Sequence, residues 1–173
     1  RRRLCARGRH VAPLGGSDDH QAGEGTGGLD SPVGSPTTMV EADELSVAGI
    51  LAGIRAGRTV VRIPGESAPM VVLSAREPLT GDTVEARRVR LLVDITGGMG
   101  GTFRVVMNGA LLGEAMAVDS DAFHFELDVV APALGEDRYR VEVVEERRPV
   151  TITSHVYVRR PAGGGGCAVL GGA

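Results

Sequence analysis

The 173-residue chain is poor in several residue types that mark particular classes of protein. It contains no lysine and no tryptophan, and only three phenylalanines and two tyrosines. So few aromatic side chains argue against a sugar-binding surface, because such a surface stacks exposed rings against the sugar. No run of about eighteen apolar residues occurs, so no segment is expected to span a bilayer. The basic start of the chain also lacks the unbroken apolar core of a signal peptide.

Cysteine and net charge are also low. The two cysteines, Cys5 and Cys167, lie near opposite ends of the chain, and we read them as unpaired because a disulfide would have to join two ends expected to be flexible. The formal net charge is −3, and five of the nineteen arginines lie in the first ten residues. A nucleic-acid partner is therefore not expected, because phosphate binding needs a basic face on the folded domain rather than a basic end.

The first third of the chain combines a long loop with one helix. Residues 15–36 are rich in glycine, acids and hydroxyl residues, and this stretch is longer than an ordinary connection. Ser46 is a suitable helix N-cap and Gly57 a suitable stop. Between them, apolar residues recur at helical spacing: Val47, Ile50, Leu51 and Ile54. We expect this helix to bury that face, to expose Arg55, and to use its two internal glycines for close packing against a sheet.

The rest of the chain is predicted to be β-structure. Residues 59–63 form a β-rich stretch that ends at a Pro-Gly pair, and residues 66–69 have the composition of a linker. From Met70 to Arg160, apolar and polar residues alternate, which is typical of strands with one buried face. Asn108-Gly109 predicts a two-residue hairpin turn. About seven short strands separated by turns indicate a β-sandwich of about 100 residues.

The stretch LGGSDDH, which contains Asp18 and His20, is the strongest candidate for chemistry. If the chain is extended from residues 11–14 onward, side chains two apart point to the same side, about 6.6 Å apart at their Cα atoms. A carboxylate and an imidazole at that spacing can reach one metal ion. The alternative is a solvated turn in which aspartate and serine bond to the local backbone.

No other residues complete a catalytic or metal site. His10 lies in the arginine-rich start, while His124 and His155 fall on the polar phase of predicted strands, which indicates surface or interface positions. Ser17 lacks a partner base, and the glycines of residues 23–28 lack the strand and helix that surround a phosphate-binding loop.

The order of these features resembles the C-terminal end of the PHP-type metallohydrolases (polymerase and histidinol phosphatase domain), most closely their CehA/McbA-like branch. The resemblance covers residues 11–63. Carried over residue by residue, it implies that Asp18 and His20 are metal ligands, while the loop at residues 34–37 and the turn at residues 55–59 flank the closing helix. The implied cofactors are divalent metal ions (Zn, Mn or Fe) in the full-length protein.

The chain also departs from that family. The H-x-H pair, the bridging glutamate and the further histidines of the family belong to earlier strands, and none of them precedes Asp18 here. The resemblance therefore implies a C-terminal fragment, with an absent N-terminal catalytic domain as partner and a small-molecule phosphoester, or a related ester or amide, as substrate. No catalytic residue is assigned in this chain.

The resulting fold class is mainly β. We expect residues 1–65 to form a strand-loop-helix-strand remnant of an α/β PHP barrel. Residues 66–160 should form an immunoglobulin-like antiparallel β-sandwich, and residues 161–173 a flexible glycine-rich tail.

Two alternatives stay open at this point. The chain could instead be a non-enzymatic β-sandwich module for binding or adhesion. The tail, GGGGCAVLGGA, is similar to the glycine-cysteine start of some bacterial C-terminal sorting signals, which slightly favours an extracytoplasmic or cell-surface location, although the apolar span and basic end of such signals do not follow.

The 173-residue chain alone is predicted to be catalytically inactive, because two ligands cannot hold a cluster of two or three metal ions and shield it from water. The measurement is hydrolysis of phosphate esters by the purified chain with added zinc or manganese. Turnover above that of the metal salt alone would contradict the prediction.

Overall fold

The computed structural model of the protein describes residues 10–20, 32–75 and 80–162. These residues are mainly β, with one α-helix and one short 3-10 helix. The helices are α2 (Val47–Ala56) and η1 (Gly65–Ser67). The first six strands are β1 (Thr37–Val40), β2 (Thr59–Arg62), β3 (Met70–Ser74), β4 (Thr83–Glu85), β5 (Arg88–Thr96) and β6 (Thr102–Met107). The others are β7 (Ala110–Leu111), β8 (Met116–Ala117), β9 (Ala122–Val130), β10 (Glu136–Glu145), β11 (Arg148–Thr153) and β12 (Val156–Arg159).

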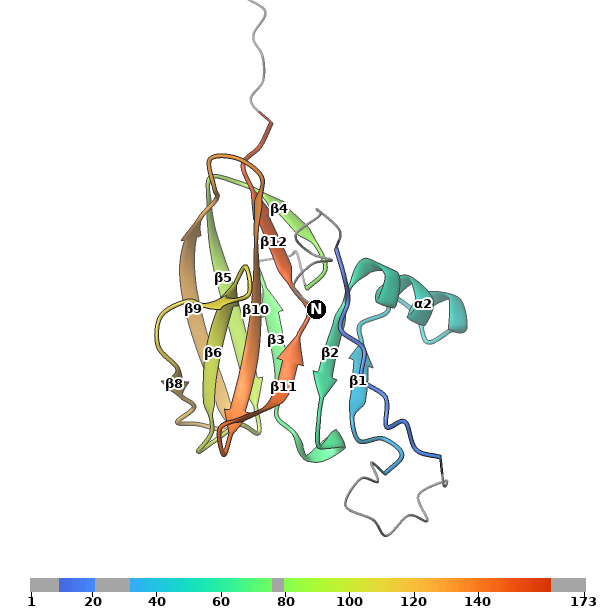
Figure 1. The fold of residues 1–173 in the computed structure, drawn as a ribbon. Coiled ribbons are helices and arrows are strands. Elements are labelled where there is room, and N and C mark those ends of the chain that lie inside the picture. Colours follow the sequence, from blue (N-terminus) through green and yellow to red (C-terminus); the bar gives the residue numbers. More distant parts are fainter. Residues whose placement is uncertain (1–9, 21–31, 76–79, 163–173) are drawn as a thin grey trace, which may run out of the picture.

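The strands form two sheets that pack face to face (Figure 1). We call the larger one sheet A and the smaller one sheet B. Sheet A is built around β10, which pairs with β6 along one edge and with β11 and then β12 along the other. Sheet B has the order β3-β5-β9. The predicted mainly β fold with paired antiparallel sheets is therefore present, and β4 adds one parallel pairing with β12.

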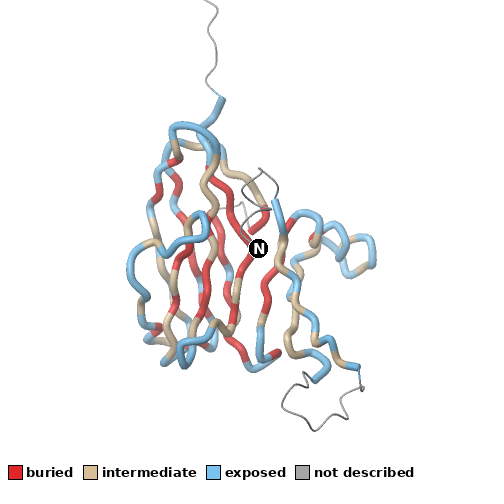
Figure 2. Tube along the Cα trace, in the orientation of Figure 1, coloured by how far each residue is buried: buried red, intermediate tan, exposed pale blue. Residues whose placement is uncertain are grey.

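The core lies between the two sheets, where Figure 2 shows the buried residues. Along β5, Val89, Leu91, Val93 and Ile95 are buried, while the residues between them face outward. Phe103 from β6 and Val141 from β10 meet them from sheet A and are fully buried. This alternation is the one that the sequence predicts, and burial of these side chains supplies the main driving force for the sandwich.

Sheet A continues into the N-terminal part of the chain. β2 pairs with β11 through Val60–Thr153, Val61–Ile152 and Arg62–Thr151, and β1 pairs with β2 in turn. Thr59, Val60 and Val61 are all buried. Residues on the two sides of the predicted boundary at residue 65 thus belong to one hydrogen-bonded sheet.

Helix α2 begins and ends where the sequence predicts. The Ser46 side chain accepts a hydrogen bond from the Gly49 N–H, and Gly57 adopts a left-handed conformation with φ 80° as the C-cap. Gly53 is the buried residue of the helix: a Cβ there would lie 2.3 Å from the carbonyl oxygen of Glu41. The predicted close packing of a helix glycine against a sheet is confirmed at this position, because Val40 at the end of β1 also borders it.

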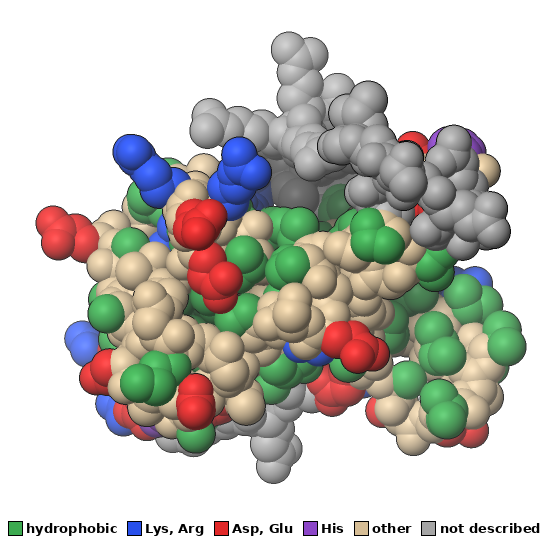
Figure 3. Space-filling model, turned by 90° about the horizontal axis from the view of Figure 1, so that it is seen from below, with side chains coloured by type: hydrophobic (Ala, Val, Ile, Leu, Met, Phe, Trp, Pro, Cys, Tyr) green, Lys and Arg blue, Asp and Glu red, His purple; other side chains and the backbone are tan. Residues whose placement is uncertain are grey.

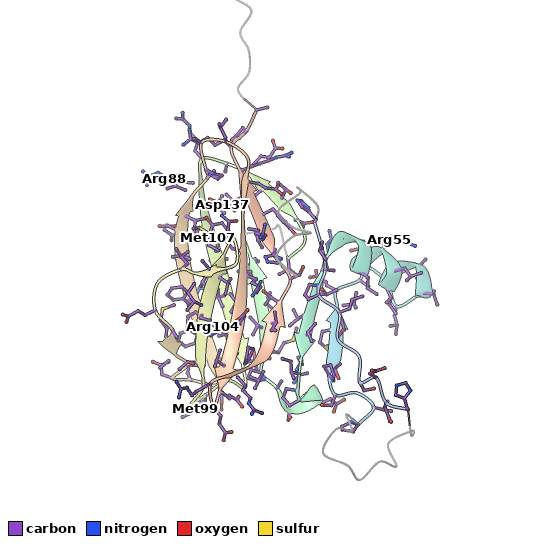
Figure 4. The ribbon with its side chains drawn as sticks, viewed as in Figure 1. Arg55, Arg88, Met99, Arg104, Met107 and Asp137 are labelled. Atoms are coloured by element: carbon purple, nitrogen blue, oxygen red, sulfur yellow. The ribbon has the colours of Figure 1, made fainter. Side chains whose placement is uncertain are left out.

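The expected burial of the apolar helix face is wrong. Val47 is 78% exposed, and Ile50 and Leu51 are exposed as well. The helix contacts β1 through its glycine side, so Val47, Ile50 and Leu51 are left exposed, while Ile54 of the same predicted face is partly buried. Arg55 is exposed, as predicted, and projects from the helix in Figure 4.

Two further local predictions have different outcomes. The Asn108-Gly109 turn is confirmed: both residues have positive φ, 53° and 88°, and β6 pairs with β7 across them. The strand expected at residues 11–14 is absent, because Pro13 has no N–H to donate and its carbonyl accepts from the Thr59 hydroxyl instead of from a strand. No helix among the described residues is long and apolar enough to cross a membrane.

Two neighbouring valines of β3 test the position of the core. Val71 is fully buried and Val72 is 40% exposed. Truncating Val71 removes two buried methyl groups and leaves a cavity, so V71A should lower the free energy of unfolding by about 2–3 kcal/mol. V72A is the matched control and should cost less than about 1 kcal/mol in a urea unfolding experiment. Equal losses for the two variants would contradict this assignment of the inward face.

Candidate functional site

The two predicted metal ligands lie together at the end of the N-terminal segment, which we define as residues 10–20. The Nε2 atom of His20 lies 3.4 Å from Oδ1 of Asp18. Both side chains are open to solvent, 84% exposed for His20 and 92% for Asp18. Asp18 has a φ of 54°, so the backbone bends there instead of staying extended as the spacing argument assumed.

The N-terminal segment is fixed to sheet A by side-chain hydroxyl groups. The Thr38 hydroxyl accepts from the Gly15 N–H at 2.9 Å and donates to the Gly15 carbonyl at 3.0 Å. Gly15 also lies against the sheet so closely that a Cβ there would be 2.8 Å from Cγ1 of Val61. Gly15 therefore allows the segment to pack closely against β2.

The donor set of the pair suits zinc, manganese or iron, because it joins one imidazole to one carboxylate. Two donors fill only part of the coordination shell of any of these ions. Among residues 10–20, 32–75 and 80–162, no group of three or more histidine, cysteine, aspartate or glutamate side chains is placed to hold a metal ion. The pair can thus supply part of a metal centre, and further ligands would have to come from outside these residues.

An apolar surface lies on the same side of the molecule as this pair. In Figure 1, the N-terminal segment, β1 and α2 occupy the side of sheet A that is remote from β9. Leu45, just before α2, is 98% exposed, and Leu14 in the segment is 60% exposed. Figure 3 shows hydrophobic side chains gathered on the helix. A helix of this composition, with Arg55 as its one charged residue, is unusual in contact with water.

A small cleft separates this surface from the sandwich. Its volume is about 170 Å³, and it lies between β1 and β3, with Met39, Val60 and Val72 in its wall. Ligand pockets usually measure about 300–1,000 Å³, so this cleft is too small to enclose an ordinary substrate. Among the described residues that line it there is no histidine, and Glu41 and Arg58 are the charged ones.

A ladder of charged side chains covers the outer face of sheet B. Arg90 on β5 binds Asp128 through two hydrogen bonds of 2.8 and 3.0 Å, and Glu126 at 2.8 Å. His124 lies 2.7 Å from Asp94 and 3.5 Å from Glu126. All five residues are well exposed, so the ladder is a network of surface ion pairs.

These contacts shift the pKa values of three members of the ladder, and that of Arg90 is raised by its bonds to Asp128 and Glu126. Hydrogen bonds from His124 to Asp94 and Glu126 raise the pKa of His124, and the hydrogen bond from Arg90 lowers the pKa of Asp128. The expected surface position of His124 is confirmed.

A second ion-pair cluster lies on the outer face of sheet A. Glu142 on β10 is only 5% exposed and accepts hydrogen bonds from Arg104 on β6 and from Arg140. Arg104 lies directly across the strands, opposite Glu142. Burial raises the pKa of Glu142, but the two arginines outweigh it and the pKa is lowered overall. The carboxylate therefore stays ionised and serves to join β6 to β10.

The other histidines lie apart from the Asp18–His20 pair. His10 stacks on Tyr157 with ring centroids 3.5 Å apart, and its Nε2 atom lies 3.0 Å from Glu136. His155 is 8% exposed and lies between β11 and β12, so of the two expected positions, surface or interface, the surface position is wrong for this residue. Residues 154–155 interrupt the strand ladder, and the residues on both sides of them are buried.

Several sequence expectations lie outside the described residues. They concern Cys5, Cys167, the glycine-rich stretch at residues 23–28 and most of the predicted tail at residues 161–173.

No family model matches the chain, and no curated protein matches it. Among solved structures, it is similar to the solution NMR structure of the CARDB domain of a Pyrococcus furiosus protein. The sequences are 19% identical, the match covers 54% of this chain and 97% of that one, and the TM-score is 0.36.

The His124 contacts predict a pH-dependent contribution to stability. Because the folded-state pKa of His124 is raised, the stabilisation is fully present below the ordinary value of about 6.5 and is lost as the pH rises through the folded-state pKa. The difference in unfolding free energy between wild type and H124Q should therefore shrink from pH ~6 to pH ~8. D94N should remove part of the same pH dependence in chemical unfolding experiments. A difference that grows with pH would contradict this assignment.

Proposed function

We propose that this chain is the C-terminal part of a metal-dependent hydrolase of the PHP type, and that Asp18 and His20 complete a metal centre built mostly by another domain. The observation that carries the proposal is the Asp18–His20 pair, whose donor atoms lie 3.4 Å apart and open to solvent. The order of sequence features from residue 11 to residue 63 supplies the chemical class.

The exposed apolar helix supports the need for a second domain. Leu45, Val47 and Leu51 form an uncovered apolar surface on the side of the molecule that also carries the ligand pair. Burial of such side chains stabilises an interface by about 1.5–3 kcal/mol each. In this proposal, the surface packs against the domain that holds the other ligands, and the open side of the metal pair is closed at the same time.

The proposed roles of the residues follow from their donor atoms. The Asp18 carboxylate and the His20 Nε2 atom would hold the metal, and the Thr38 and Thr59 hydroxyls would keep the segment on sheet A. When bound, the metal ions activate water and neutralise charge on the leaving group. The substrate class is a small-molecule phosphoester, or a related ester or amide.

A non-enzymatic β-sandwich binding module is the second candidate. It is favoured by the composition of the hydrophobic core cluster, whose members all lie between Val71 and Val158. The sandwich core thus needs no side chain from the N-terminal part. In that case α2 and the Asp18–His20 pair would be additions to the surface of the sandwich and would have no role in catalysis.

The proposed function is tested on the gene that encodes this chain. The reading frame on the 5′ side of the Arg1 codon should encode an H-x-H pair and a glutamate. The protein made from the whole frame should bind divalent metal and hydrolyse phosphate esters, and D18N and H20Q should each lower metal content and reduce kcat/KM by about 10²-fold or more.

Two controls separate metal binding from folding and docking. D128N changes an exposed aspartate on the far sheet and should leave hydrolysis within about twofold of wild type. L51E should weaken docking of the helix onto the catalytic domain without changing the Asp18–His20 pair itself. A whole-frame protein without upstream histidines, or with full activity in both D18N and H20Q, would refute the hydrolase proposal and favour the binding module.

A further inference from the structure

His155 is a buried histidine whose ring nitrogens make no hydrogen bond. It lies between β11 and β12, is 8% exposed, and both Nδ1 and Nε2 are buried without a hydrogen-bond partner. A buried polar group in this condition costs free energy unless it stays neutral or gains a partner. Such a group requires a physical reason for its position.

The N-terminal segment runs across the place where His155 is buried. At one end, the Thr59 hydroxyl donates to the Pro13 carbonyl, and Ser154, the neighbour of His155, donates its N–H to the Thr59 carbonyl. At the other end, the Val11 N–H donates to the Tyr157 hydroxyl at 3.4 Å. The segment therefore spans from Ser154 to Tyr157, the two sides of His155.

Three rings form a row beneath this crossing. His10 stacks on Tyr157 at 3.5 Å with an interplanar angle of 10°. The ring centroid of His155 lies 5.9 Å from that of Tyr157. His155 thus lies at one end of a row of three rings, and the segment supplies the other end of that row through His10.

The charged groups around His155 are unfavourable to a second positive charge. Arg138 and Arg140 approach from β10, and His10 approaches from the segment. Burial and these three groups lower the pKa of His155 to about 4. The nearby carboxylates have their own partners, since Glu142 binds Arg140 and Glu136 lies beside His10. On the β4 side, Asp82 lies 3.8 Å from Arg58.

We propose that His155 is a proton-operated switch: protonation of its ring releases the N-terminal segment from the outer face of sheet A. A protonated His155 ring needs water or a carboxylate as a hydrogen-bond acceptor. When the segment dissociates from sheet A, water can reach the ring. The neutral ring fits the docked state, which the His10–Tyr157 stack and the Thr59 bond hold in place.

The size of the effect follows from the two protonation equilibria. If release returns His155 to its ordinary pKa of about 6.5, acidification from pH ~7 to pH ~5 should favour the released state by about twentyfold. The docked segment should therefore be fully stable above pH ~6.5 and should weaken as the pH falls toward pH ~4.

The test is amide exchange measured by NMR on the full chain. The Val11 and Gly15 amides report on docking, since they donate to Tyr157 and Thr38. Their protection factors, corrected for the intrinsic pH dependence, should fall more than tenfold from pH ~7 to pH ~5 in wild type. In H155Q, which keeps a neutral side chain, they should change less than twofold.

The same exchange experiment includes a control variant and the outcomes that would overturn the proposal. H124Q should behave as wild type, and amides in β5 should stay protected throughout, which separates local release from global unfolding. If H155Q does not fold, the 13C-labelled His155 ring is titrated in wild type. Constant protection of Val11 and Gly15 in wild type would overturn the proposal. A fall in H155Q equal to that in wild type, or titration of His155 near pH ~6.5 with the segment still docked, would overturn it as well.

Discussion

The pairing of β2 with β11 is the interaction on which the position of the whole N-terminal part depends. Three residue pairs join the N-terminal part to the sandwich, and the buried residues Thr59, Val60 and Val61 make this strand part of the interior. β1 is attached through β2, α2 through β1, and the N-terminal segment through the hydroxyls of Thr38 and Thr59. The positions of Asp18 and His20 therefore depend on the pairing of β2 with β11, although β2 lies about forty residues after them in the sequence.

The sandwich was predictable because its information is local. Alternation of apolar and polar residues along β5 and β6 indicates which side of each strand is buried. Asn108-Gly109 indicates a turn because both residues readily adopt the positive φ that the turn requires. The caps of α2 were predictable for the same reason, since Ser46 and Gly57 act on their nearest neighbours. The register that sets Asp94 opposite His124 depends on two distant strands, and no local pattern encodes it.

The candidate site was predictable only in part. The spacing of Asp18 and His20 correctly suggested that the two side chains lie together, but the bend at Asp18 and the absence of a strand at residues 11–14 were not visible. The apolar face of α2 was read as a buried face because periodicity shows that a face exists and leaves open what covers it. His155 falls in the ladder break between β11 and β12, where alternation no longer indicates which residues are buried.

The β9 edge of sheet B and the α2 side of sheet A differ in the kind of side chain that they expose. β9 forms one edge of sheet B, and on its outer face His124, Glu126 and Asp128 are held in ion pairs that a second sheet would have to break or desolvate. Charge at an edge opposes strand-to-strand aggregation. At the α2 end, Val47 and Leu51 are exposed and uncharged. Contact with another protein at the β9 edge would therefore cost the desolvation of these ion pairs, a cost that contact through Val47 and Leu51 would not carry.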